Sequence, residues 1–153
     1  EEVTMNMVKL PALLIAAVLA LIAVSVHWYF NLGERPRFSL PWLGALIGFA
    51  GLFVMTWAKN VFKREGLAIM PTSKTAHLTT AGPYRFTRNP MYLGTVLLLL
   101  GLSLYIGTIP FYLAAIGCFA VLNSVFCCFE ENKLIEAFGQ EYREYRNRVR
   151  RWL

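Results

Sequence analysis

Long apolar runs separated by short polar segments dominate the hydrophobic pattern of the chain. Residues 10–32 are apolar almost throughout, and a run of roughly 20 residues or more suits a helix that crosses a bilayer. A second run extends from Pro41 to about residue 61, a third covers about residues 91–106, and a fourth ends at Phe129. This pattern predicts an all-α, polytopic membrane protein with about four transmembrane helices.

Proline and glycine mark the ends of these predicted helices. Pro90 suits the first turn of the third span, and Gly139 is expected to end one helix so that another begins at Gln140. Between the third and fourth spans, Thr108 is a plausible N-cap and Pro110 falls in the first helical turn. So short a turn makes these two spans an antiparallel hairpin.

Three glycines, Gly44, Gly48 and Gly51, lie along one face of the second span. Small residues allow close approach of helices in a membrane. The stripe fits packing within one chain or between two chains, and the oligomeric state stays open. It contains no dinucleotide-binding glycine motif, and no strand precedes it.

The chain becomes amphipathic after Glu130 and Glu131. Apolar and aromatic residues recur at helical spacing, with Arg and Glu between them. We expect an amphipathic cytoplasmic helix here. The basic run at residues 146–151 is interpreted as lying on anionic lipid.

Composition supports a single membrane domain spanning residues 1–153. Hydrophobic residues make up 57% of the chain, more than a soluble domain of this size can bury. The net charge of +6 comes from residues beside the apolar segments, which favours cytoplasmic retention over nucleic-acid binding. Both termini and the long polar loop at residues 62–88 are therefore expected on the cytoplasmic side of an inner or plasma membrane.

Cysteine usage indicates neither a disulfide framework nor a metal site. Cys118, Cys127 and Cys128 are few, badly spaced for ligands, and lie in one apolar helix. Cysteine in such a setting usually acts as a small hydrophobic residue. We expect no metal.

Two polar clusters flank the last two spans. Arg88, Asn89 and Tyr92 open the third span, and Glu130 and Glu131 close the fourth. The predicted orientation places both clusters at one membrane surface. Acids at this position could simply have reached water, but a buried carboxylate needs a cationic partner or a ligand. We expect Glu130 to face the bundle, with Arg88 as its partner or with a ligand between the clusters.

Three blocks in this order resemble the isoprenylcysteine carboxyl methyltransferase family of integral membrane enzymes, whose neighbours are the phospholipid N-methyltransferases. The blocks are residues 82–94 (GPYRFTRNPMYLG), 130–131 (EE) and 138–145 (FGQEYREY). The resemblance covers about residues 68–153. It implies a methyltransferase that depends on S-adenosylmethionine and acts on a lipophilic, membrane-embedded acceptor.

The resemblance also implies site residues. Arg88 and Tyr92 would act in catalysis, and Arg88 and Phe126 would meet the acceptor. The residues that would line the cofactor are Ala76, His77, Leu78, Thr79, Tyr84, Asn89, Pro90, Met91, Tyr92, Glu130 and Glu131.

Two positions depart from the family pattern. Asn89 stands where the family usually has His, and Asn cannot titrate near neutral pH. Phe126 stands where members that methylate prenylcysteine carry Arg, and an apolar side chain cannot neutralise a carboxylate. The alternatives are a catalytically altered relative that only binds cofactor, a structural bundle, and a membrane reductase.

Overall fold

The structure is a computed structural model of the chain in which residues 12–31, 38–65 and 77–153 are described. Every regular element in these ranges is helical, so the all-α prediction is confirmed. The elements in chain order are α2 (Ala12–Tyr29), α3 (Pro41–Arg64), the 3₁₀ turn η2 (Gly82–Arg85), α4 (Pro90–Ile106), α5 (Ile109–Val121), the π-helical turn η3 (Leu122–Phe126), α6 (Cys127–Phe138) and α7 (Gln140–Arg148).

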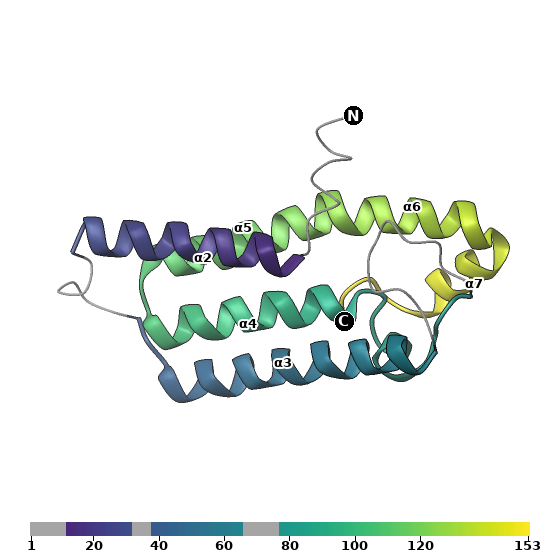
Figure 1. Ribbon diagram of the computed structural model, residues 1–153, viewed down its shortest axis with the longest axis horizontal. Coiled ribbons are helices and arrows are strands. Elements are labelled where there is room, and N and C mark those ends of the chain that lie inside the picture. Colours follow the sequence, from purple (N-terminus) through teal and green to yellow (C-terminus); the bar gives the residue numbers. More distant parts are fainter. Residues whose placement is uncertain (1–11, 32–37, 66–76) are drawn as a thin grey trace.

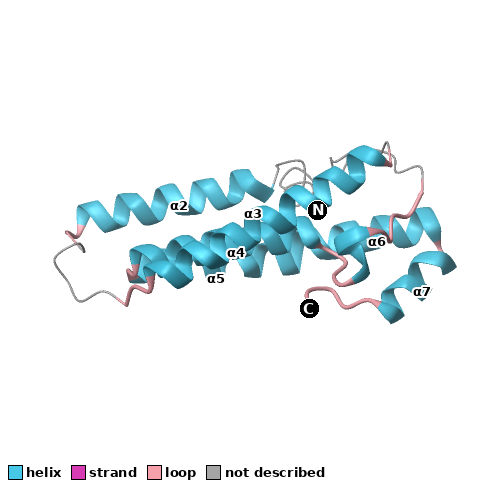
Figure 2. Cartoon of the chain, turned by 90° about the horizontal axis from the view of Figure 1, so that it is seen from below, coloured by secondary structure: helices cyan, strands magenta, loops and turns pink. Residues whose placement is uncertain are grey.

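The long helices form an elongated bundle (Figures 1 and 2). α2 packs mainly on α5, and α4 packs mainly on α3 and joins the two pairs. α5, η3 and α6 make one continuous helix, Ile109–Phe138, which carries α7 at its far end (Figure 1). After α7 the chain runs back toward the start of α4. Residues far apart in the sequence therefore meet at this end of the bundle.

Three helices in the described residues are long and apolar enough to cross a membrane: Ala12–Tyr29, Pro41–Arg64 and Ile109–Phe138. The third predicted span is the apolar helix α4, which has only 17 residues. The protein is therefore an integral membrane protein with three candidate spans and a shorter apolar helix. The helix that carries the fourth predicted span continues unbroken beyond Phe129 to Phe138, and it ends just before Gly139 as predicted.

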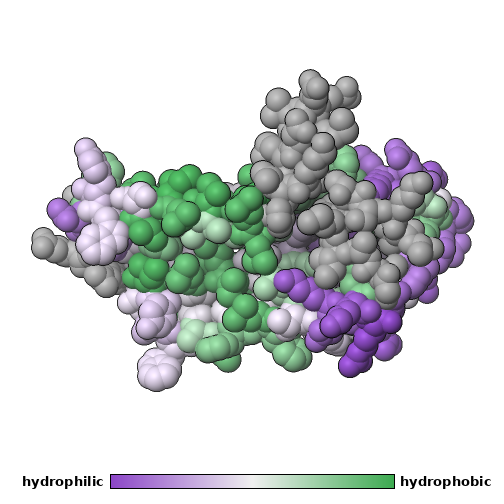
Figure 3. Space-filling model, viewed as in Figure 1, coloured by the Kyte–Doolittle hydropathy of each residue, from purple (hydrophilic) through white to green (hydrophobic). Residues whose placement is uncertain are grey.

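The surface of the bundle fits a bilayer. Apolar side chains cover its middle, whereas hydrophilic side chains gather at the end formed by α6 and α7 (Figure 3). Leu21, Leu46 and Phe49 are 65%, 67% and 71% exposed. A helix in water would turn such residues toward a core, whereas hydrocarbon accepts them on the outer surface.

The helix ends lie close to the predicted positions. Pro90 begins α4, and Gly139 (φ +53°) separates α6 from α7. Gly107 ends α4 in the left-handed conformation (φ +77°), which glycine adopts without steric penalty. Thr108 holds the predicted N-cap position of α5, but its hydroxyl makes no capping hydrogen bond.

Glycines bring the backbones of α3 and α4 into contact. A Cβ atom on Gly101 of α4 would lie 2.5 Å from the Gly48 nitrogen and 2.6 Å from the Gly44 oxygen. Gly51 and Gly94 form a second such contact, where a Cβ atom on Gly94 would lie 2.6 Å from the Gly51 oxygen. The stripe on the second predicted span thus packs within the chain.

Gly101→Ala is therefore expected to destabilise the bundle, by about 1–3 kcal/mol for an overpacked backbone contact. Rotamer changes cannot relieve the clash, because the neighbouring atoms belong to the α3 backbone. The thermal midpoint of the detergent-solubilised protein measures the effect. Gly48→Ala is the matched control, since its Cβ would meet nothing within 4 Å. Equal midpoints for the two variants would contradict the packing.

Candidate functional site

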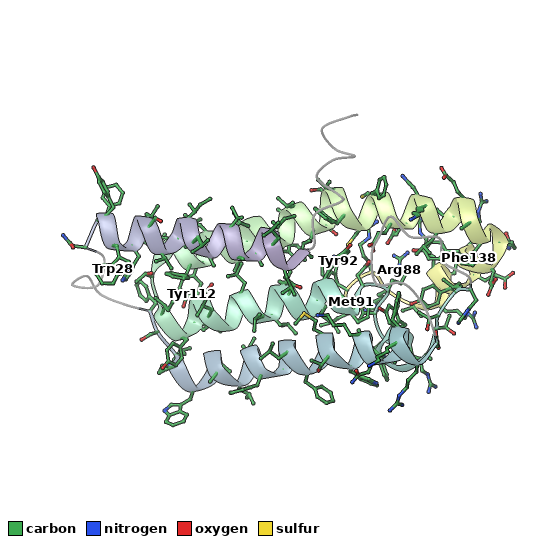
Figure 4. The ribbon with its side chains drawn as sticks, viewed as in Figure 1. Trp28, Arg88, Met91, Tyr92, Tyr112 and Phe138 are labelled. Atoms are coloured by element: carbon green, nitrogen blue, oxygen red, sulfur yellow. The ribbon has the colours of Figure 1, made fainter. Side chains whose placement is uncertain are left out.

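The two predicted polar clusters meet at the hydrophilic end of the bundle. The Tyr92 hydroxyl donates a 2.6 Å hydrogen bond to Glu130 Oε1, joining α4 to α6. Arg88, Met91 and Tyr92 lie together at the start of α4, near α6 (Figure 4). The prediction that both clusters share one end of the molecule is confirmed.

Glu131 is the buried centre of the site, with 4% of its surface exposed. Arg151 donates two hydrogen bonds to it, from Nε to Oε1 at 2.9 Å and from Nη2 to Oε2 at 2.7 Å. Arg88 also contacts this carboxylate, with Nη1 3.3 Å from Oε1. The two guanidinium groups provide the charge compensation that a buried carboxylate requires. The hydrogen bonds to Glu131 in turn raise the pKa of Arg151 above its ordinary value.

Of the two partners considered for Glu130, Arg88 or a ligand, the first is wrong, because Arg88 pairs with Glu131. The physical reason is that neighbouring residues of a helix point about 100° apart. Glu130 faces α4 and accepts from Tyr92, so the next residue, Glu131, is the acid that meets Arg88. Both acids follow the π-helical turn η3.

Residues 150–152 belong to the site, although the sequence pattern assigned their basic run to lipid. The Arg150 carbonyl accepts a 3.0 Å hydrogen bond from the Arg88 backbone N–H. The Arg151 carbonyl accepts one from the Thr87 hydroxyl at 2.9 Å. The interpretation of Arg151 as a lipid contact is corrected, because its side chain lies on Glu131. One sequence signal could have pointed to Arg151, because a buried acid requires a cation as its partner. Helical periodicity, however, does not show that the chain returns to the acids after its last helix.

The amphipathic helix α7 is confirmed, and its aromatic face packs on protein. Tyr142 and Tyr145 are 1% and 4% exposed. The Tyr145 hydroxyl donates a 2.7 Å hydrogen bond to the Tyr84 carbonyl oxygen in η2. Burial raises the pKa of Tyr142 to about 12 and raises that of Tyr145 as well. These phenols therefore stay neutral, and they hold α7 against the polar stretch that contains η2.

Asn89, the first departure from the family pattern, has structural partners. Its backbone N–H donates to the Thr87 hydroxyl at 3.3 Å, and its side-chain Nδ2 donates to the Arg151 carbonyl at 3.4 Å. Asn89 is 7% exposed and precedes Pro90, which is buried as well. In this structure Asn89 holds residues 150–152 on α4.

Phe126, the second departure, lies in η3 and is fully buried. Its ring meets the Tyr92 ring edge-on, with centroids 6.0 Å apart. An apolar side chain therefore sits directly behind the tyrosine that holds Glu130.

The other predicted cofactor residues lie around this end. Thr79 is buried, and its hydroxyl has no hydrogen-bond partner among the described residues. Leu78 is half-buried, and His77 is exposed with Nε2 3.4 Å from Glu65 Oε2. Ala76 lies outside the described residues.

The fold and the site define the class of protein: it is an integral membrane helix bundle whose acids and arginines gather at one polar end. Residues 40–141 match the family model of phospholipid methyltransferases. The chain belongs to the phospholipid methyltransferase family, as its three sequence blocks predicted.

The chain is also 41% identical, over 63 residues, to an uncharacterized protein of Haemophilus influenzae. The match covers 41% of this chain and all of that protein. No solved structure matches the chain significantly.

Proposed function

We propose that this chain transfers a methyl group from S-adenosylmethionine to a lipophilic acceptor at the cytoplasmic membrane surface. The observation that carries the proposal is the Tyr92–Glu130 hydrogen bond beside the buried Glu131 cluster, at the polar end of an apolar bundle. Family membership supplies the reaction class. The excess of Lys and Arg at this end supports the cytoplasmic side.

The residues present fit this cofactor. Its ammonium group needs an acceptor, which Glu130 offers, and its carboxylate and hydroxyl groups need donors. Arg88 Nε and the Thr79 hydroxyl are buried and lack hydrogen-bond partners among the described residues. Such unsatisfied buried donors require an explanation, and a polar ligand provides one. Glu130, Arg88 and Thr79 are therefore the residues that would hold it.

S-adenosylmethionine, when bound, would supply a methyl group on a sulfonium sulfur: the acceptor would attack the methyl carbon in line, and the sulfur would leave as the neutral thioether of S-adenosylhomocysteine. The task of the protein is to hold the groups in line and to exclude water. A neutral amine or an anionic acceptor needs no strong general base. This agrees with Asn89, which cannot titrate near neutral pH and whose side chain is bound to the Arg151 carbonyl.

The surroundings of the site support a lipophilic acceptor. The exposed apolar surface of the bundle lets a lipophilic molecule arrive sideways from the bilayer (Figure 3). Phe126 offers no charge to an acceptor carboxylate, so prenylcysteine is disfavoured. An amine or another nucleophile on a lipid fits better.

Methyl transfer is tested directly with purified protein, S-adenosylmethionine labelled in its methyl group, and total membrane lipids. We expect label in the lipid extract with the wild-type protein and background label with Glu130→Gln. Binding of the cofactor without labelling of any lipid would favour a cofactor-binding relative that lacks catalysis. A failure to bind cofactor would leave a structural bundle.

Tyr92→Phe is expected to weaken binding of S-adenosylhomocysteine by roughly fivefold, the equivalent of about one hydrogen bond. The variant removes only the hydroxyl that orients Glu130 and keeps the ring against Phe126. Calorimetry in detergent measures the change. Tyr105→Phe is the matched control, because Tyr105 lies on the same helix and is 58% exposed. Wild-type affinity in Tyr92→Phe would show that the hydrogen bond does not serve binding.

A further inference from the structure

Residues 150–152, which we call the clasp, are fixed across the start of α4. The Arg150 carbonyl accepts from the Arg88 N–H, and the Arg151 carbonyl accepts from the side chains of Thr87 and Asn89. All three donors lie in the polar stretch that precedes α4. The clasp thereby holds the backbone from which Arg88 projects.

The other side of the clasp is fixed to the continuous helix Ile109–Phe138. The Trp152 indole N–H donates a 2.9 Å hydrogen bond to Asn123 Oδ1, and Arg151 Nη1 lies 3.4 Å from the same oxygen. The Trp152 ring packs on Phe119 with centroids 4.9 Å apart. Asn123 lies in the π turn η3, which sets the direction of the two acids. The clasp therefore joins the two halves of the site.

Two arginines compete for the one buried carboxylate of Glu131. Arg151 occupies both oxygens with short bonds, at 2.9 and 2.7 Å. Arg88 makes one longer contact with Glu131, at 3.3 Å, and also a side-chain hydrogen bond with Tyr142. Its Nε has no partner among the described residues. The Arg88 side chain is nevertheless the more buried of the two, at 10% exposed against 28%. With two cations on one anion, this cluster carries an excess positive charge.

From this arrangement we infer that Arg151 is a positioning residue: by binding both oxygens of Glu131, it keeps Arg88 available to the ligand of the site. Without Arg151, Glu131 would be free to take Arg88 in a bidentate pair and turn it away from the ligand. The inference rests on the proposed function, because it assigns the vacant Arg88 donor to the cofactor-binding site. It also predicts a structural change that needs no ligand to observe.

The experiment compares Arg151→Met and Arg151→Lys with the wild type in the full chain. We expect Arg151→Met to weaken S-adenosylhomocysteine binding by roughly tenfold or more, since small displacements at a site can have effects of this size. Arg151→Lys should recover part of the affinity, because an ammonium restores the charge but does not reproduce the planar two-donor fork. Arg148→Met, an exposed position on α7, is the matched control.

Hydrogen–deuterium exchange at the Arg88 amide, which donates to the Arg150 carbonyl, provides the readout that is independent of ligand. We expect faster exchange in Arg151→Met than in the wild type or in Arg148→Met. Faster exchange with unchanged affinity would reduce Arg151 to a structural role and overturn the inference, while the proposed function would stand. If the wild type binds no S-adenosylhomocysteine, the proposed function fails, and with it the role of Arg151 toward that ligand. In that case the exchange measurement still tests the clasp: an unchanged exchange rate of the Arg88 amide in Arg151→Met would show that Arg151 does not hold residues 150–152 in place.

Discussion

Glu130→Gln is expected to weaken S-adenosylhomocysteine binding by about 100-fold, the equivalent of roughly 3 kcal/mol for a charge-assisted hydrogen bond. Glutamine matches the shape of glutamate, and its amide oxygen still accepts from the Tyr92 hydroxyl. The variant therefore removes the negative charge that would face the ligand ammonium and keeps the internal contact. Calorimetry in detergent micelles measures the affinity.

Glu136→Gln is the matched control for this variant. Glu136 lies on the same helix and is exposed, so the same change of charge there should leave the affinity as it is. The thermal midpoint of Glu130→Gln should remain close to that of the wild type. An affinity equal to the wild type would remove Glu130 from the cofactor site and leave its bond to Tyr92 as a structural contact.

Glu131→Ala is expected to produce the largest loss of stability, about 3 kcal/mol, the lower end of the range for breaking a buried ion pair. The substitution leaves Arg88 buried without its carboxylate and opens the space between two guanidinium groups. Partial exposure of Arg151, at 28%, lets water compensate one of the two cations and limits the loss. The thermal midpoint of the detergent-solubilised protein measures the effect.

Glu141→Ala on α7 is the control for Glu131→Ala, since Glu141 is exposed. The thermal midpoint of Glu141→Ala should stay close to that of the wild type, because surface substitutions usually change stability little. A wild-type midpoint for Glu131→Ala would show that the arginines find other partners and that the buried cluster does not hold the site together. Comparing the two acids separates their roles, because Glu130→Gln acts on binding and Glu131→Ala acts on stability first.

Local sequence signals predicted much of the fold. The length of the apolar runs predicted the helices. Pro90 predicted the start of α4, and Gly139 predicted the break before α7. These features depend on interactions within one or two helical turns, so a single sequence contains them. The charge pattern also predicted that Tyr92 and Glu130 share one end of the bundle, which their hydrogen bond confirms.

The sequence motif identified the family as well. The three blocks at residues 82–94, 130–131 and 138–145 carried the resemblance together, and the family model matches residues 40–141. The residue roles inherited from the family remain predictions, which the variants above test.

Only the tertiary structure decided which charges pair. Glu131 meets Arg88, while its neighbour Glu130 accepts from Tyr92, and no periodicity in the sequence predicts which acid takes which partner. Arg151 reaches Glu131 because the chain reverses after α7, a path set by the buried Tyr142 and Tyr145. Pairings across 20 or more positions depend on the summed geometry of every helix between them, whereas helices and turns depend on neighbours along the chain. The sequence by itself therefore determined the elements and the family, and the packing determined the partners within the site.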